Sequence, residues 1–145
     1  MKSTAILELM TKDHGKIIKL LRNVEQSISK DLMMTMKAFD TFEWELEKHI
    51  FTEEKAIFSS YNPTNIVEGY KMVPELIKQH NEILNRLRMM RKNLQWQRPI
   101  DYDEFKELIM THKTFEEVSL YPKLDQELST AQKEEIIKKI HEMIS

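Results

Sequence analysis

The sequence predicts an all-α protein, specifically an up-down-up-down antiparallel four-helix bundle with a short C-terminal helix. Three features support this prediction. In four long segments, apolar residues recur at alternating steps of three and four, as on the inner face of a helix. Only two glycines and four prolines interrupt the 145 residues, too few for a fold of many strands. The segments are joined by short connections, which favour antiparallel neighbours.

The first helix is expected to begin at Ser3 or Thr4, because both are good N-cap residues. The second is expected to run from about Asp31 to Ser59. Tyr61-Asn62-Pro63 should end it, since proline and the residue before it resist helical geometry. The inward faces of these two helices are predicted to carry Leu7, Met10, His14, Ile17, Leu21, Val24 and Ile28, and then Phe39, Phe42, Leu46, His49, Glu53 and Ala56.

The third helix has a clear inward face from Val73 onward, whereas Asn65 to Gly69 fits either a turn or a first helical stretch. Pro74 suits the first turn or a kink. The helix should end before Pro99. Its predicted inward face carries Val73, Ile77, His80, Leu84, Leu87, Met90 and Leu94.

The fourth helix is expected to open near Asp101 or Asp103 and to break or bend at Tyr121-Pro122. Ser129 and Gln132 have the spacing of a capping box, which predicts a short terminal helix. The inward face of the fourth helix is predicted to carry Phe105, Leu108, His112, Glu116 and Ser119.

No linker divides the chain, so a single domain is expected over residues 1–145, with the bundle over about 3–125 and the terminal helix over about 130–144. The net charge is −2, from 22 basic and 24 acidic residues, and no basic stripe favours nucleic acid as a partner. No apolar run is long enough to span a membrane, and no signal-peptide pattern is visible. A cytoplasmic protein without a membrane partner is therefore expected.

The two halves of the chain repeat one pattern of polar residues. His49 begins the segment His-x-x-x-Glu-Glu in the first half, and His112 begins the same segment in the second. A lone histidine precedes each segment, His14 in the first half and His80 in the second. The order is therefore the same in both halves.

These residues have the chemistry of a metal centre. With no cysteine in the chain, any metal must be held by imidazole and oxygen ligands. Residues four apart share a helix face, so the six side chains can converge in the core. Burying unpaired polar groups there costs roughly 2–7 kcal/mol each, which a pair of metal ions would offset. Imidazole and carboxylate ligands suit iron, with manganese or zinc as substitutes. The predicted ligands are His14, His49, Glu53, His80, His112 and Glu116.

In this arrangement each metal takes two histidines, while Glu53 and Glu116 bridge the pair. Positions then remain for a bridging oxygen and for a small external ligand. The alternative is a plain helical bundle, because lone histidines are often satisfied core residues and His-x-x-x-Glu pairs also occur on helix surfaces. The duplication of the pattern favours the metal centre. Neither the His-Glu-x-x-His of zinc proteases nor the Glu-x-x-His of ferritin-like proteins occurs.

The pattern resembles the hemerythrin family, in its hemerythrin-like (HHE) cation-binding branch, over about residues 5–125. Leu120-Tyr121-Pro122 closes the second segment as it often does in that family. The resemblance implies a non-haem di-iron centre (Fe2+/Fe3+) with a bridging oxo or hydroxo group. It also implies that Glu53 and Glu116 bridge the irons and that the four histidines are terminal ligands.

Two departures distinguish the chain from oxygen-carrying hemerythrins. Those proteins have a fifth histidine on the third helix, where this chain has Leu76 and Leu84 at the flanking positions. They also have an aspartate at the position of Glu117. The symmetric pattern is closer to the branch with iron-sensing and nitrosative-stress proteins, although the chain lacks the cysteine-bearing segment of the iron–sulfur repair members.

Three functions fit such a centre. The first is binding or sensing of a small ligand such as oxygen, nitric oxide or peroxide. The second is an enzyme of oxidative or nitrosative stress defence that turns over peroxide or nitric oxide or supplies iron for repair, for which no catalytic side chain stands out. The third is an iron-sensing or iron-handling module that acts through an unidentified protein partner.

Several residues near the six are expected to have supporting roles. Glu45 fits a solvated helix edge, with contact to an imidazole N–H or a place as a spare ligand as the alternatives. Glu54 and Glu117 are expected behind the ligands or on the surface. Phe58 and Tyr121 are expected to pack the end of the bundle rather than to touch metal.

The remaining aromatic and sulfur-containing residues are expected in the interior. Trp44, Trp96 and the ten methionines fit core and gap-filling positions. His141 lies outside the repeat, in a segment rich in lysine and glutamate, and is expected on the surface.

Overall fold

The fold was described from a computed structural model, which places residues 4–28, 30–60 and 66–144. Within these ranges every regular element is helical and no strand occurs, which confirms the all-α class. Two π-helical turns and one 3-10 turn interrupt the α-helices. The α-helices are α1 (Ala5–Ile28), α2 (Leu32–Thr52), α3 (Ile66–Gln95), α4 (Tyr102–Phe115), α5 (Tyr121–Glu127) and α6 (Thr130–Ile144).

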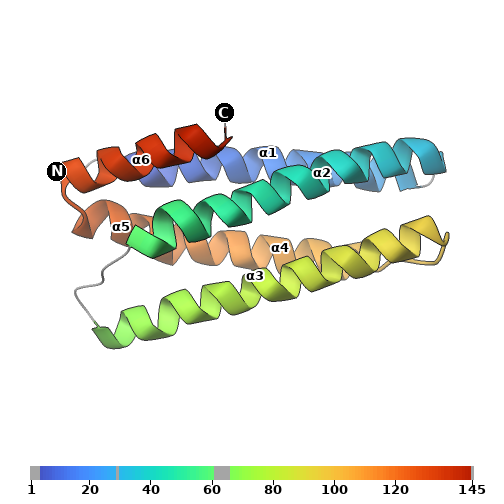
Figure 1. Ribbon diagram of the computed structural model, residues 1–145. Coiled ribbons are helices and arrows are strands. Elements are labelled where there is room, and N and C mark those ends of the chain that lie inside the picture. The colour runs from blue at the N-terminus through green and yellow to red at the C-terminus, as the bar shows by residue number, and fades with distance from the viewer. Residues whose placement is uncertain (1–3, 29, 61–65, 145) are drawn as a thin grey trace.

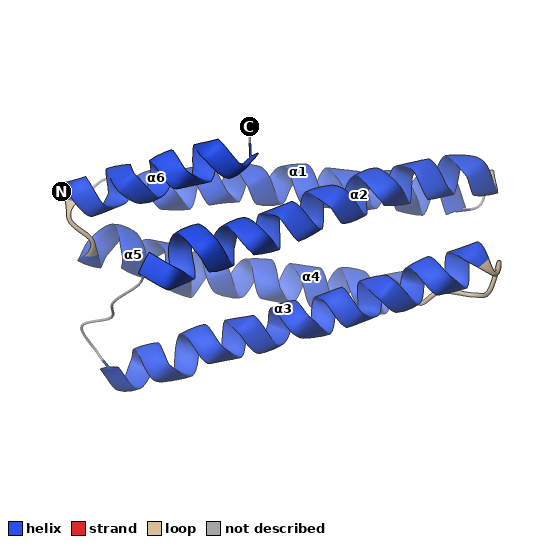
Figure 2. Ribbon diagram, in the orientation of Figure 1, coloured by secondary structure: helices blue, strands red, loops and turns tan. Residues whose placement is uncertain are grey.

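The four long helices are α1, α2, α3 and α4, the last of which continues through a π-helical turn into α5. They lie alongside one another (Figure 1). Each of α1 to α3 packs against the next helix in the chain, and α4 also packs against α1. The terminal helix α6 covers α1 and α2 near one end of the molecule, and the described residues between the helices are loops or short helical turns (Figure 2). Among the described helices, none is both long and apolar enough to cross a membrane.

Three helix starts are fixed by the side chains that the sequence indicates. Asp31 caps α2 by accepting a backbone N–H at 2.7 Å, and Asp101 caps α4 by accepting one at 2.9 Å. Ser129 and Gln132 form the expected reciprocal capping box at the start of α6, with contacts of 2.9 and 3.2 Å. These local signals were therefore sufficient at three of the four starts that they addressed.

Of the two residues predicted to start α1, Ser3 lies outside the described residues, and Thr4 does not act as the expected cap. Thr4 directly precedes α1, but its hydroxyl contacts the Glu8 carboxylate at 2.9 Å instead of capping the backbone. The cap comes from Asp125 on α5, which accepts the N–H groups of Ile6 at 3.1 Å and Leu7 at 2.9 Å. Asp125 is buried and links the start of α1 to α5.

Replacing Asp125 with alanine is expected to lower the free energy of unfolding by about 3 kcal/mol. The substitution removes the α1 cap and also the carboxylate that lies 3.6 Å from the buried Lys133 Nζ. Urea unfolding followed by circular dichroism would measure the loss. Thr4→Ala is the matched control and should change stability by less than about 0.5 kcal/mol. Equal effects of the two substitutions would show that Asp125 does not hold the start of α1.

The helical backbone passes through the point where a break was expected. Tyr121-Pro122 begins α5 directly after a π-helical turn, and the chain leaves helical geometry only at Leu128. Pro122 has no N–H to donate, and it directly follows the π-helical turn, in which the regular four-residue bonds of the α-helix are already replaced. At the other uncertain proline, Pro74 lies inside α3, which runs on to Gln95. Residues 61–63, the predicted end of the second helix, and Asn65 lie outside the described residues.

The inward face of α3 begins one residue away from the prediction. Ile77 is 38% exposed and Val73 is only partly buried, whereas Met72 and Leu76 are buried. Both Leu76 and Ile77 are apolar, so periodicity alone could not choose between them. Packing selects Leu76, which lies in the same apolar cluster as Tyr121.

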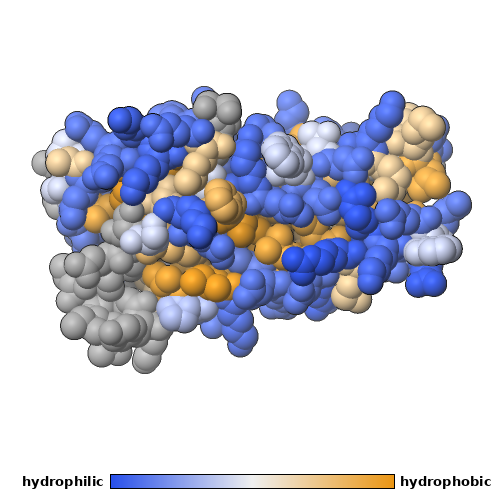
Figure 3. Space-filling view, in the orientation of Figure 1, coloured by the Kyte–Doolittle hydropathy of each residue, from blue (hydrophilic) through white to orange (hydrophobic). Residues whose placement is uncertain are grey.

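Both tryptophans are on the surface, contrary to the prediction. Trp44 is 66% exposed and Trp96 is 71% exposed. Trp44 lies between Phe42 and Leu46 of α2 and so falls off the inward face of that helix. Figure 3 shows apolar surface along the boundary between α2 and α3.

His141 is exposed, as expected. Contrary to the prediction that the methionines are interior, four of those in the described part of the chain are exposed: Met33, Met34, Met89 and Met110.

Candidate metal centre

The structure brings all six predicted ligands to one place. Each of the four long helices supplies one histidine: His14 on α1, His49 on α2, His80 on α3 and His112 on α4. Each glutamate begins a π-helical turn, Glu53 after α2 and Glu116 after α4. All six side chains are buried, with at most 7% of each residue exposed.

The six residues form two overlapping groups. His14 and His49 form one with both glutamates, and His80 and His112 form the other with the same two glutamates. In each group, one ligand atom per residue lies within 4.8 Å of the others. We refer to the group of His14 and His49 as the first position and to that of His80 and His112 as the second position. Because both groups share the glutamates, a carboxylate can reach two ions at once.

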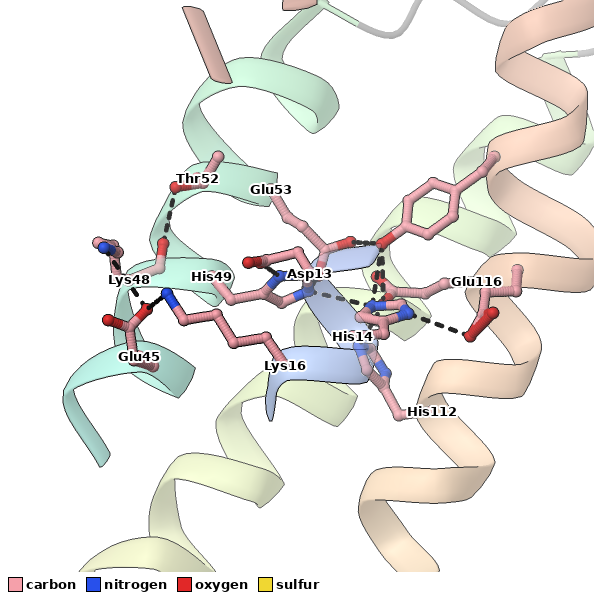
Figure 4. A network of polar contacts seen from close by, with 12 residues as sticks. Asp13, His14, Lys16, Glu45, Lys48, His49, Thr52, Glu53, His112 and Glu116 are labelled. Atoms are coloured by element: carbon pink, nitrogen blue, oxygen red, sulfur yellow. Dashed lines mark hydrogen bonds and ion pairs between the residues drawn. The ribbon is translucent and has the colours of Figure 1, made fainter. Parts of the chain in front are cut away.

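The distances show how the carboxylates join the helices. Glu53 Oε1 lies 2.9 Å from His49 Nε2 and 3.4 Å from His80 Nε2. Glu116 Oε1 lies 3.2 Å from Nε2 of both His14 and His112. Figure 4 shows the glutamates turned toward His14, His49 and His112. Each glutamate therefore contacts one histidine of each position.

The Nδ1 atom of each of the four histidines in the centre contacts a further side chain. Such a contact fixes the orientation of the ring and leaves Nε2 free to face a metal. The expectation that Glu54 and Glu117 stand behind the ligands is confirmed. Asp13 and Gln79 were not predicted, although each directly precedes a lone histidine in the repeat. The Nδ1 contacts are His14 with Glu117 at 3.2 Å, His80 with Glu54 at 3.3 Å, His112 with Gln79 at 2.6 Å, and His49 with Asp13.

Four buried atoms of the centre make no hydrogen bond of normal geometry, although each lies 2.9–3.9 Å from an atom of another ligand. They are one oxygen of Glu53, one oxygen of Glu116, and Nε2 of His80 and of His112. Leaving such a group unpaired costs about 1–3 kcal/mol. Carboxylate oxygens and imidazole nitrogens are metal-binding atoms, so cations at this site would satisfy all four. The residues present therefore fit a metal pair.

The histidines differ in their protonation behaviour. Burial lowers the pKa of His14 to about 4 and that of His112 to about 3, so both rings are neutral at pH 7. Burial also opposes a charge on His49, but the carboxylates of Glu53 and Asp13 raise its pKa to about 9. In the metal-free centre His49 is therefore an imidazolium.

The two glutamates are also inequivalent. Burial alone would raise the pKa of Glu53, but the adjacent His49 cation holds it well below its usual range. Burial and the charge of Glu53 together raise the pKa of Glu116 well above its usual range. Without metal, the centre therefore contains an ion pair of Glu53 with His49 and a protonated Glu116. A metal would replace both protons.

Tyr121 lies inside the centre, which corrects the prediction that it packs the end of the bundle. The residue is fully buried. Its hydroxyl oxygen lies 2.8 Å from Glu53 Oε2, 3.2 Å from Glu116 Oε1 and 3.3 Å from His14 Nε2. Phe58, at the corresponding place in the first half, stacks on the His80 ring with centroids 5.5 Å apart.

The π-helical turns explain why Tyr121 was misplaced. The N–H of Tyr121 donates to the carbonyl of Glu116, and the N–H of Phe58 donates to the carbonyl of Glu53. These bonds span five residues instead of four, so each turn holds one extra residue. A residue five positions after the glutamate then returns to the glutamate's side of the helix. Such turns are frequent at functional sites.

Glu45 takes no part in the centre. Its carboxylate pairs with Lys16 at 3.1 Å and with Lys48 at 3.5 Å, on the outer side of α2 (Figure 4). The reading of Glu45 as a helix-edge residue therefore fits better than a role as a ligand or an imidazole acceptor.

A small cavity adjoins the histidines. Each long helix supplies an apolar side chain to its wall: Ile17, Leu46, Ile83 and Ile109. His14, His49 and His112 also line it, and there is room for a water-sized molecule. The centre separates two apolar clusters, and this cavity lies on the side away from Tyr121. The cavity therefore offers space for a small molecule beside the histidines, with mostly apolar walls and with Lys113 also among the lining residues.

Buried histidines and glutamates from separate helices, with unpaired ligand atoms, define a helical cation-binding protein. Residues 5–101 match the family described as "Hemerythrin HHE cation binding domain". The match covers more than half of the chain, and the protein belongs to this hemerythrin-like family. No match to a curated protein or to a solved structure was found.

Proposed function

We propose that the protein is a non-haem di-iron protein that binds or senses a small ligand such as oxygen, nitric oxide or peroxide. In this proposal α1 to α4 form an up-down-up-down four-helix bundle. His14 and His49 hold one iron, and His80 and His112 hold the other. Glu53 and Glu116 bridge the pair.

The observation that carries the proposal is the pair of ligand groups that share two buried carboxylates beside an apolar cavity. Two imidazoles and two carboxylates per ion suit iron, with manganese or zinc as substitutes. Iron bound there would supply a redox-active site with unfilled coordination positions. The chain's contribution is to orient the four imidazoles and to exclude bulk water.

The cavity favours a small ligand over a larger substrate. Its wall residues Ile17, Leu46, Ile83 and Ile109 have no hydrogen-bonding side-chain atoms, and the free space is about that of one small molecule. Diatomic molecules and peroxide meet both conditions.

The test is to purify the protein without chelator, to count its iron and to record its ultraviolet–visible spectrum in air. We expect about two irons per chain and bands of an oxo-bridged ferric pair. His112→Ala should lose them, whereas His141→Ala, which alters an exposed histidine, should keep them. The reduced protein should then change its spectrum with oxygen or nitric oxide. Failure to bind iron after reconstitution with ferrous salt would overturn the proposal.

Filling the cavity is expected to block the ligand without removing the metal. Ile109→Phe should weaken binding of nitric oxide by the reduced protein at least about tenfold, because the larger ring occupies the ligand space. Leu87→Phe is the matched control, since Leu87 lies in the same apolar cluster but not on the cavity wall. Spectral titration of both iron-loaded variants would measure the effect. Equal affinities in the two variants would show that ligands arrive by another route.

A second candidate is an enzyme of oxidative or nitrosative stress defence. The observation that favours it is the Tyr121 hydroxyl, which lies within 3.3 Å of three predicted ligands and can deliver a proton to the site. Repeated turnover of peroxide or nitric oxide that falls in Tyr121→Phe, with iron content unchanged, would support this candidate. Reaction that stops after one equivalent would favour ligand binding or sensing instead.

A further inference from the structure

The two metal positions differ in one residue of their surroundings. Asp13 and Gln79 stand at the same place in the repeat, each directly before the lone histidine. They also have the same role: Asp13 accepts the Nδ1–H of His49, and Gln79 Oε1 accepts that of His112 at 2.6 Å. The acceptor is therefore an anion at the first position and a neutral amide at the second.

The other acceptor of each position adds to this difference. Glu117 holds His14 of the first position and is 16% exposed, whereas Glu54 holds His80 of the second position and is 35% exposed. Water screens the more exposed carboxylate more strongly. Glu117 also pairs with Lys113 Nζ at 2.9 Å, which offsets its charge, so the main difference is between the 13% exposed carboxylate of Asp13 and the amide of Gln79.

Acceptors of this kind act on the metal through the imidazole. A carboxylate that accepts the Nδ1–H raises the basicity of Nε2 and adds negative charge near the cation. A neutral amide orients the ring but adds no charge. Loss of such a supporting contact typically lowers metal affinity 10- to 100-fold.

We propose that the position of His14 and His49 binds its metal tightly and that the position of His80 and His112 holds the exchangeable ion, because Asp13 supports the first where Gln79 supports the second. The inference rests on the proposed metal pair, and it adds which ion leaves first when metal becomes scarce.

One contact acts in the opposite direction. Nε2 of His14 lies 3.1 Å from Nε2 of His49, and a metal at the first position must displace this contact between two histidines. At the second position Nε2 of His80 and Nε2 of His112 instead lie 3.4 and 3.2 Å from glutamate oxygens. Because His49 is charged in the metal-free centre, its contact with His14 contributes about 10- to 100-fold to an equilibrium. That cost is comparable with the effect of one supporting carboxylate, so the response of each step to substitution of Asp13 and Gln79 tests the proposal, and the order of the steps in the unaltered protein does not.

Two substitutions of nearly unchanged shape test the assignment. The metal-free full-length protein would be titrated with Co2+, and the two stepwise affinities would be followed by the visible bands of the bound ion. Asp13→Asn should weaken the tighter step 10- to 100-fold, and Gln79→Glu should strengthen the weaker step about tenfold. The double variant should reverse the order. His112→Ala, which keeps the first position, should bind one Co2+ more tightly than His49→Ala does.

Repulsion between two bound cations would also make the second Co2+ bind more weakly than the first. A difference between the two affinities is therefore no test of the proposal, whereas their response to the substitutions is. The proposal is overturned if Asp13→Asn weakens both steps equally or neither, or if Gln79→Glu leaves the weaker step unchanged. A damaged fold cannot imitate the gain expected for Gln79→Glu. If the unaltered protein binds neither two Co2+ nor two irons, the di-metal function itself fails, which is a different result.

Discussion

Removing the metal is expected to lower the melting temperature of the protein by about 10 °C. A ligand present at about a thousand times its dissociation constant stabilises the folded state by about 4 kcal/mol, and for a chain of this size each kcal/mol shifts the melting temperature by roughly 2–4 °C. The structural reason is that metal-free Glu53, His80, His112 and Glu116 each have an unpaired buried atom.

Thermal unfolding of the iron-loaded and chelator-treated protein would measure this shift. Glu116→Ala should unfold at the same temperature with and without iron, because it removes a ligand of both positions. His141→Ala should retain the full shift. Identical melting temperatures for the loaded and metal-free protein would contradict metal-coupled stability. They would also exclude an iron-sensing role in which loosening of the helices passes a signal to a protein partner.

Metal uptake at pH 7 is expected to release about two protons and to strengthen as the pH rises. In the metal-free centre His49 is protonated, since its pKa is raised to about 9, and Glu116 is protonated because its pKa is raised well above the usual range. Both must lose their protons to bind a cation. His14 and His112 are already neutral, with pKa values lowered to about 4 and 3, and contribute none.

Proton linkage determines how the affinity for metal depends on pH. The metal-free form binds more protons than the loaded form below about pH 9, the pKa of His49, so the apparent affinity for metal falls as the pH falls below that value. Each proton released changes the affinity by up to about tenfold per pH unit. Calorimetric titration with Zn2+ in two buffers of different ionisation enthalpy would count the protons. Asp13→Asn should release fewer, because Asp13 helps to raise the pKa of His49. Release of less than half a proton would contradict the protonation states described above.

The six candidate ligands could be predicted from the sequence because the same order of histidines and glutamates occurs in both halves of the chain. One histidine on a helix face has many explanations, but the repeated order of His14 with His49 and His80 with His112 has few. Helix starts at Asp31, Asp101 and Ser129 were predictable for a related reason, since each depends on atoms within a few residues.

The features that were missed depend on contacts distant in sequence or on altered helical geometry. The α1 cap comes from Asp125, which is 119 residues away from Ile6. Tyr121 reaches the centre because a turn of five-residue bonds shifts the helix face, and periodicity arguments assume four-residue bonds throughout. Trp44 was expected in the core because of its residue type, but its position between Phe42 and Leu46 places it off the inward face of α2, and it is on the surface.

The two halves of the chain hold each other's ligands in place. Glu117 of the second half holds His14 of the first, and Glu54 of the first half holds His80 of the second. Neither half of the chain therefore contains all the side chains of the centre. If one half shifted along the other, one histidine of each position would lose the side chain that orients it. The proposed metal pair would therefore require both halves of the chain to be correctly aligned.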